Sequence, residues 1–138
     1  MKSAICTAIG IAGAAAASVI GGLDAALGTL ITFMATDFLT GLMVAGFGRS
    51  EKTKKGGLDS HVGWKGLAKK GVILLLVLVA HRLDLTLGSE YVRNTVIIGF
   101  TANELISITE NAGLLGVPMP KGLRNAIEIL KSKGGENE

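Results

Sequence analysis

Ionisable and amide side chains lie inside or at the edges of long apolar stretches of this sequence, where an isolated charge is costly. A charge at the centre of a bilayer costs about 2.5 to 3.5 kcal/mol on insertion scales. Such groups must therefore face a bonding partner, another helix or water. The candidate residues are Asp24, Asp37, His81, Arg82, Asp84, Asn103, Glu104, Glu110 and Asn111. Their chemistry suits interhelical hydrogen bonding, the lining of an aqueous lumen, or a proton or ion relay.

The spacing of four of these residues favours a polar stripe along one helix. Asn103 and Glu110 are seven residues apart, as are Glu104 and Asn111, so the four side chains share one side of a helix. A rise of about 1.5 Å per residue places Asp37 roughly 20 Å, and Glu104 roughly 15 Å, from the outer ends of their helices. Both then lie near the membrane midplane. Either the stripe packs against Asp37, Thr40 and His81, or it lines a water-filled lesion after the protein oligomerises.

The elements that must position these residues are four apolar segments, at about residues 4–20, 23–47, 71–87 and 95–112. Hydrophobic residues make up 49% of the chain and charged residues only 18%, whereas a soluble domain of 138 residues needs more surface charge. We therefore predict an all-α membrane protein with about four transmembrane helices in residues 1–112. Residues 113–138 form a cytoplasmic tail with a short amphipathic helix, and the chain should be disordered from Lys133 onward.

A basic connection between the second and third segments, residues 48–70, predicts the orientation. Seven positive residues against Glu51 and Asp59 give this stretch a net charge of +5. The positive-inside rule places it in the cytoplasm, so both termini are also cytoplasmic, and a nucleic-acid site is disfavoured. Arg93 falls on the outer side, where we expect Glu90 to neutralise it. The positive residues of the loop are Arg49, Lys52, Lys54, Lys55, Lys65, Lys69 and Lys70.

Small residues recur at helical spacing in the first segment. Gly13, Ala17 and Gly21 are four residues apart, which lets helix backbones approach closely in lipid, and we assign Gly41 the same packing role. A secretory signal peptide is the rival interpretation of this segment. The single cysteine, Cys6, cannot form an internal disulfide, and too few residues precede it for a lipoprotein anchor.

No enzyme motif competes with the membrane interpretation. The sequence lacks a phosphate-binding glycine loop and a His-x-x-x-His pair, and His61 and His81 are its only histidines. We therefore expect a protein that is not an enzyme, with no catalytic residues, cofactor or metal site.

Six short stretches, in order, resemble the toxin-secretion and phage-lysis holins of Gram-positive bacteria and their phages. The resemblance covers the chain from Gly21 to Lys131. The stretches are Gly-Gly-Leu-Asp at 21–24, Phe-Met-Ala-Thr-Asp-Phe-Leu-Thr-Gly at 33–41, Val-Gly-Trp-Lys-Gly-Leu-Ala-Lys-Lys at 62–70, Ala-His-Arg-Leu-Asp at 80–84, Ala-Asn-Glu-Leu-Ile-Ser-Ile-Thr-Glu-Asn at 102–111 and Gly-Val-Pro-Met-Pro at 116–120. The Ala-rich first segment is the least similar part.

The resemblance implies a function by assembly and brings no active-site residues. Members of this family accumulate in the bacterial cytoplasmic membrane as multi-pass proteins and form homo-oligomeric lesions that release an endolysin, and some are linked to toxin export. The expected partners are membrane lipid, further copies of the chain, and functionally an endolysin or toxin. The alternatives are a small ion or proton channel or transporter subunit that uses Asp37, Glu104 and His81 as a relay, and an inert membrane scaffold.

The orientation gives a topology prediction. With Cys6 replaced by serine, a cysteine introduced by Lys54→Cys or Ser132→Cys should react with an impermeant thiol reagent only from the cytoplasmic side. Ser89→Cys should react only from outside. Translocating the basic connection would oppose the positive-inside bias, so labelling of position 54 from outside would contradict the orientation.

Overall fold

Helices make up most of the chain. The structure is a computed structural model that describes residues 1–136. Its helices are α1 (Lys2–Val19), α2 (Ala25–Gly46), α3 (Ser60–Leu87), α4 (Val92–Leu114) and α5 (Lys121–Glu136). Residues 1–136 contain no strand, so the predicted all-α class is confirmed.

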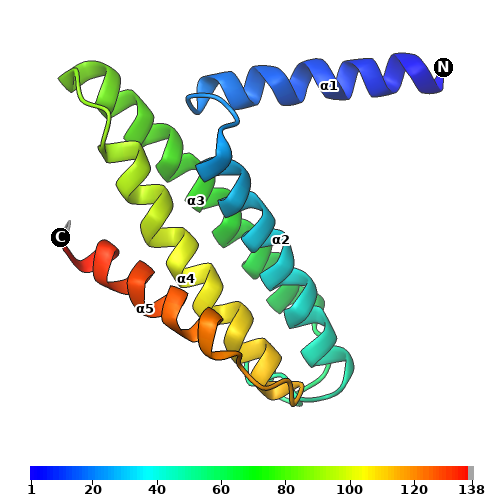
Figure 1. The fold of residues 1–138 in the computed structure, drawn as a ribbon. Helices are drawn as coiled ribbons and strands as arrows, with labels where there is room; N and C mark the ends of the chain where they lie inside the picture. Colours follow the sequence, from blue (N-terminus) through cyan, green and yellow to red (C-terminus); the bar gives the residue numbers. More distant parts are fainter. Residues whose placement is uncertain (137–138) are drawn as a thin grey trace.

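Helices α2, α3 and α4 form a bundle in which α4 contacts both of the others, and α5 runs back along α4 (Figure 1). The centre of the bundle is an apolar cluster from all three helices, formed by Leu27, Leu30, Met34, Val77 and Ile97. The α2 members are three and four residues apart and therefore share one face of the helix. In contrast, α1 extends away from the bundle at the end where α2 begins, and none of its residues is buried (Figure 1).

Within residues 1–136, two helices are long and apolar enough to cross a membrane, namely α1 and α2. The prediction of about four spanning helices is thus supported only for these two. Helices α3 and α4 have 28 and 23 residues, which correspond to about 42 and 35 Å against a hydrocarbon core of about 30 Å. Their length suffices, but their charged residues lower their hydropathy.

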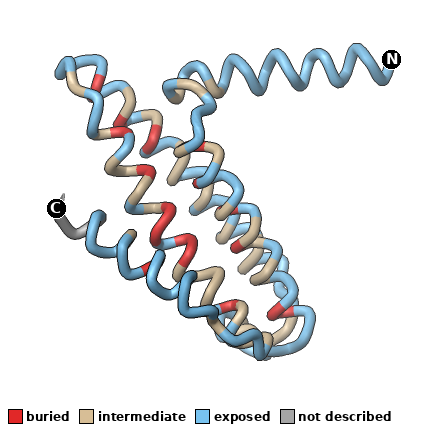
Figure 2. The backbone as a smooth tube through the Cα atoms, viewed as in Figure 1, coloured by how far each residue is buried: buried red, intermediate tan, exposed pale blue. Residues whose placement is uncertain are grey.

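Polar residues are buried in the bundle while large apolar residues cover much of its outside. Figure 2 shows buried positions along α4 and none on α1. The buried polar residues are Asp37, Asp84, Arg93, Thr101, Glu104 and Asn111. Exposed apolar residues of α2 and α3 include Leu39, Met43, Leu75 and Val79. The bundle therefore has an apolar core, but it also buries charged residues and exposes large apolar residues that a water-soluble bundle would more often bury.

The third helix is longer than predicted. It begins at Ser60 rather than at about residue 71, so the predicted loop over residues 48–70 is wrong for residues 60–70, and the non-helical connection is 47–59. The Asp59 side chain caps the helix by accepting hydrogen bonds from the backbone N–H groups of His61 (2.9 Å) and Val62 (3.3 Å). Lysine is a good helix former, so the helix continues through Lys65, Lys69 and Lys70.

The C-terminal helix also extends further than predicted. The expected helix after Pro120 is confirmed, but it continues to Glu136, so the predicted disorder is wrong for residues 133–136. Residues 137–138 lie outside the described part of the chain. Ile127 is buried, consistent with the packing of α5 against α4.

Arg93 joins the turn between α1 and α2 to the start of α4. Its guanidinium donates hydrogen bonds to the carbonyl oxygens of Ile20 (2.7 Å) and Gly22 (2.9 Å) and pairs with the carboxylate of Asp24 (2.7 Å), the residue that caps α2. The expectation that Glu90 neutralises Arg93 is therefore wrong. The ion pair is formed across the fold rather than along the chain.

Asp84 of α3 binds the start of α4, next to Arg93. Its carboxylate accepts hydrogen bonds from the hydroxyl of Ser89 (2.6 Å) and from the backbone N–H groups of Val92 (3.0 Å) and Arg93 (2.9 Å). Gly21 lies beside this network with a φ of 100°, and a Cβ atom there would lie 2.8 Å from Nδ1 of His81. Position 21 therefore requires glycine both for its backbone conformation and for the close approach.

These contacts predict that Arg93→Lys destabilises the protein. A lysine cannot donate to all three groups from one planar fork, so we expect a loss of about 2 kcal/mol, at the low end for charged hydrogen bonds because half of the Asp24 side chain is exposed. Thermal unfolding in detergent measures this. Arg82→Lys is the matched control, because Arg82 is exposed and its side chain has no partner among the described residues. Equal melting temperatures of the two variants would contradict the prediction.

The ion pair of Asp24 and Arg93 also predicts that the stability of the protein decreases at acidic pH. The hydrogen bond from Arg93, and next the one from the Leu27 N–H, lower the pKa of Asp24. The contribution of Asp24 to the free energy of unfolding is therefore complete above the pKa of an unfolded aspartate, about 3.9. It is lost as the pH falls through the lower pKa that Asp24 has in the folded state. In an acid titration of stability, Asp24→Asn should flatten this part of the curve, and an unchanged curve would refute the assignment.

Candidate functional site

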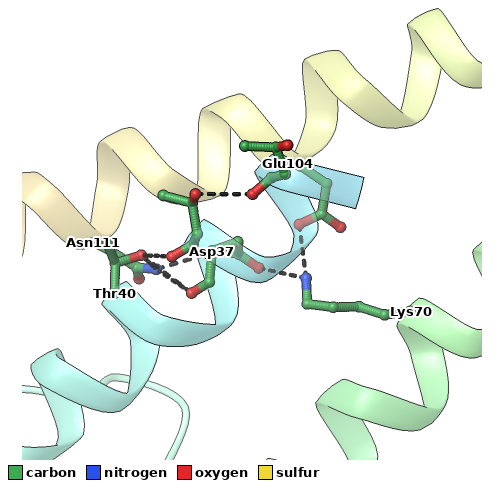
Figure 3. A network of polar contacts seen from close by, with 7 residues as sticks. Asp37, Thr40, Lys70, Glu104 and Asn111 are labelled. Atoms are coloured by element: carbon green, nitrogen blue, oxygen red, sulfur yellow. Dashed lines mark hydrogen bonds and ion pairs between the residues drawn. The ribbon is translucent and has the colours of Figure 1, made fainter. Parts of the chain in front are cut away.

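Three ionisable side chains meet inside the bundle, one from each of its three helices. The ammonium group of Lys70 in α3 lies 2.8 Å from Oδ2 of Asp37 in α2 and 2.7 Å from Oε2 of Glu104 in α4 (Figure 3). We call these three residues the ion cluster. Their side chains are 14%, 11% and 6% exposed, respectively, so most of their surface is removed from solvent.

Asn111 extends the ion cluster along α4. Its side-chain amide donates to Oγ1 of Thr40 (2.9 Å) and to both the backbone carbonyl oxygen and Oδ1 of Asp37 (3.2 Å each), as Figure 3 shows. A Cβ atom on Gly41 would lie 3.7 Å from the Asn111 amide, an ordinary contact distance. The amide thus ties α4 to α2 beside the ion pairs.

The ion cluster holds one cation between two carboxylates. If all three groups are ionised, a single negative charge remains in excess. Removing one member of a buried pair is strongly destabilising, by about 3 to 5 kcal/mol, because the other charge is left uncompensated. The cluster can therefore hold three helices together, and separating any of them would leave a charge that needs water.

The predicted polar stripe divides into two faces. Glu104 and Asn111 are buried and belong to the network just described, whereas Asn103 and Glu110 are exposed. The expected contacts of the stripe with Asp37 and Thr40 are present, through Asn111. Asn103 lines a cavity beside the ion cluster, and Glu110 lines a smaller one.

Other predicted polar residues lie at the opposite end of the bundle. His81 is eleven residues from Lys70 on α3, about 16 Å along the helix, and lies next to Gly21. Asp24 and Asp84 bind Arg93 there, and Arg82 is exposed. The three residues expected to form an ion relay are therefore not in contact as a group, because His81 lies far from Asp37 and Glu104.

Lys70 belongs to the site although its charge and neighbours in the sequence predict a place in the basic loop. Two signals were available. Asp59 followed by Ser60 is a helix-start pattern, which extends the helix upstream of the apolar run. Lys70 then lies seventeen residues from Leu87, roughly 25 Å from the end of α3, close to the depth estimated for Asp37.

The remaining predicted residues have varied environments. Arg49 donates to the carbonyl oxygen of Leu114 (3.2 Å) and so links the end of α2 to the end of α4. Lys52, Lys65 and Lys69 line the larger cavity, whereas Lys54 and Lys55 do not. Gly13 has open space around it, and α1, which also carries Ala17, contains no buried residue.

Metal ligands are not grouped in the part of the chain that the structure describes. Residues 1–136 bring together no set of three or more histidine, cysteine, aspartate or glutamate side chains that could hold a metal ion. Cys6 is a free, exposed thiol.

Comparison with known proteins places most of the chain in one family. Residues 14–132 match the bacteriophage holin family. An uncharacterised protein of Listeria monocytogenes is 41% identical over 119 residues, which are 86% of this chain and 80% of that protein. An uncharacterised protein of Clostridium perfringens is 38% identical over 117 residues, with 83% and 82% covered.

A phage protein with a functional name is also similar. The probable holin of Bacillus phage phi105 is 30% identical over 76 residues, 54% of this chain and 56% of its own length. No solved structure matches the chain. The match over residues 14–132 shows that the chain belongs to the bacteriophage holin family.

Proposed function

We propose that this protein is a holin in the functional sense: copies accumulate in the bacterial cytoplasmic membrane, associate, and open a lesion through which an endolysin or a toxin leaves the cell. Membership of the holin family and the similarity to a probable phage holin support this proposal. No enzymatic step is required. The membrane lipid and other copies of the chain are the direct partners.

One observation carries the proposal, namely that charged groups are enclosed while large apolar side chains face outward. Asp37, Lys70 and Glu104 bond to one another inside the bundle, and residues such as Leu39 and Leu75 are exposed. An apolar surface of this kind can contact lipid. Ionisable residues inside membrane-spanning bundles are costly and rare, so they usually mark a functional site.

The proposed topology has four spanning helices, α1 to α4, with the connection 47–59 in the cytoplasm. The two ends of the bundle support it. The end of α4 is hydrogen-bonded to Arg49 after α2, whereas Arg93 at the start of α4 binds the α1–α2 turn. The exposed length of α1, with Gly13 and Ala17, leaves it free to pack against another copy.

In this proposal the ion cluster holds the resting state closed. Asp37, Lys70 and Glu104 neutralise one another between helices and are shielded from lipid. Opening separates the helices, and water then solvates the charges in place of their protein partners. Glu104 and Asn111, which now face α2 and α3, would become part of a lumen between copies.

Charge variants should change the time of lysis in a predictable direction. Lys70→Gln leaves two buried carboxylates without a cation, which destabilises the closed state by about 3 to 5 kcal/mol, so lysis should begin earlier. Glu104→Gln leaves a neutral pair of Lys70 with Asp37 and should delay lysis, as should Asp37→Asn. Each variant is expressed with an endolysin, and culture density and membrane abundance are recorded together.

Two further variants make this experiment decisive. Lys55→Gln removes a charge from the connection that has no bonding partner among the described residues, and it should lyse like the parent. The triple variant Asp37→Asn, Lys70→Gln, Glu104→Gln keeps hydrogen-bonding groups without charge. Its time of lysis should be closer to that of the parent than the time of Lys70→Gln alone. If all variants lyse at the time of Lys55→Gln at equal abundance, the ion cluster does not control opening.

Purified protein should release large cargo from vesicles. A lesion that passes a folded enzyme should release an entrapped protein together with a small dye, and it requires more than two copies because four helices cannot enclose a protein-sized lumen. Gly13→Leu with Ala17→Leu should alter association, measured as oligomer mass in detergent, because bulk there separates backbones. Release of the dye alone would favour an ion channel, and a monomer at lytic concentration would refute assembly.

A further inference from the structure

A cavity of about 600 Å³ opens beside the ion cluster, lined by residues of α2, α3, α4 and the connection 47–59. Its innermost lining includes Asp37, Lys70 and Glu104. Apolar residues, Phe38 and Leu42 among them, also line the cavity. The cavity therefore extends from the charged centre of the bundle to the basic end of the molecule.

The mouth of the cavity is cationic. Lys52, Lys65 and Lys69, here called the rim lysines, all line it, and their ammonium groups have no hydrogen-bond or ion-pair partner among the described residues. Among the described residues, Asp59 is the one acidic residue that lines the cavity outside the ion cluster, and its carboxylate already accepts two backbone hydrogen bonds at the start of α3. His61 lies there as well.

We propose that this cavity binds a phosphate-bearing anion, supplied by the headgroup of an anionic phospholipid in the cytoplasmic leaflet. The proposal rests on the membrane orientation given above. Basic pockets between helices on the cytoplasmic side are suited to anionic headgroups, and an exposed lysine attracts such a surface. The rim lysines contact the phosphate, and the apolar wall contacts the hydrocarbon of the same molecule.

The charges within the cavity fix where the anion stops. The innermost part holds two carboxylates against one lysine and repels an anion, so the phosphate stays at the rim. Binding there would bridge the connection 47–59, through Lys52, to α3, through Lys65 and Lys69. Occupied by lipid, the cavity would hold together the two segments that flank the ion cluster.

The single tryptophan provides a local probe. Trp64 is 73% exposed and lies between Gly63 and Lys65, both of which line the cavity. The full chain is reconstituted in phosphatidylcholine vesicles that contain a small fraction of phosphatidylglycerol brominated on its acyl chains, or the same fraction of brominated phosphatidylcholine. We expect stronger quenching of Trp64 fluorescence by the brominated phosphatidylglycerol, and equal quenching would overturn the proposal.

Matched charge variants separate a site from a general basic surface. The double variant Lys65→Gln, Lys69→Gln should lower the preference for phosphatidylglycerol by up to about thirtyfold, because each lysine near an anionic surface contributes about fivefold. The control Lys54→Gln, Lys55→Gln removes the same charge from the same region outside the cavity and should retain most of the preference. If both double variants lose the same share of the preference, the lysines attract anionic lipid in general and the cavity is not a specific site.

A shape variant tests the cavity itself at constant charge. Gly66 lines the cavity and has no neighbour within 4 Å of a Cβ atom, so Gly66→Leu fits the backbone and fills the space. Gly71→Leu adds the same bulk to the same helix outside the cavity, also in open space. Only Gly66→Leu should lower the preference, and circular dichroism checks that both variants remain helical.

A free phosphate is tested as the other source of this chemistry. Inorganic phosphate is added to protein in pure phosphatidylcholine vesicles and to the brominated phosphatidylglycerol sample. If phosphate changes the Trp64 emission or competes with the lipid, and the double variant Lys65→Gln, Lys69→Gln abolishes that effect, the site binds free phosphate. If phosphate has no effect while the preference for phosphatidylglycerol is present, the site binds the lipid headgroup. Protein that fails to float with vesicles would refute the membrane proposal too, whereas floating protein without preference for either anion overturns this inference alone.

Discussion

Lys70 lies between Asp37 and Glu104, and each of the three residues comes from a different helix of the bundle. In water, helices associate largely because their apolar faces avoid solvent. In lipid this driving force is absent, since acyl chains are as apolar as leucine, and packing and interhelical polar contacts must hold the helices together. A charge left alone in hydrocarbon is costly, so each helix of the bundle is constrained by the other two. Moving any one of them exposes a charge unless water enters.

The opposite end of the bundle is constrained by Arg93, which reaches back to Ile20, Gly22 and Asp24. These contacts fix the turn before α2 and leave α1 outside the bundle. The two ends thus differ. One is closed by a fork of hydrogen bonds to backbone and carboxylate, whereas the other opens into a cationic cavity beside the ion cluster. In the proposed function, water would reach the ion cluster most directly through this cavity.

Part of this arrangement could be predicted from the sequence. The helical class followed from composition, and the rise per residue placed Asp37 and Glu104 at similar depth, where one lysine now joins them. The contact of Asn111 with Thr40 also agrees with the polar stripe. These features depend on periodicity along single helices, which a sequence displays directly.

Other features depend on contacts between distant segments. The sequence offers Arg93 a partner only in its neighbour Glu90, yet its actual partner Asp24 is 69 residues away. The sequence also indicates a loop at Lys70, because hydropathy falls at charged residues whether or not the helix continues. The direction of α1 is set by a turn whose conformation depends on Gly21 meeting His81 and Arg93, and no pattern within residues 1–24 predicts it.

The ion cluster should be present in the resting protein within a membrane. Solid-state NMR of protein labelled with ¹⁵N at lysine Nζ and ¹³C at the side-chain carboxyl groups of aspartate and glutamate, reconstituted in lipid, measures it directly. We predict a short-range dipolar coupling of one lysine nitrogen to both an aspartate and a glutamate carboxyl carbon. This coupling should be lost entirely in Lys70→Gln and lost for the aspartate alone in Asp37→Asn. A membrane-embedded, non-lytic protein in which no lysine nitrogen couples to a carboxyl carbon would contradict it.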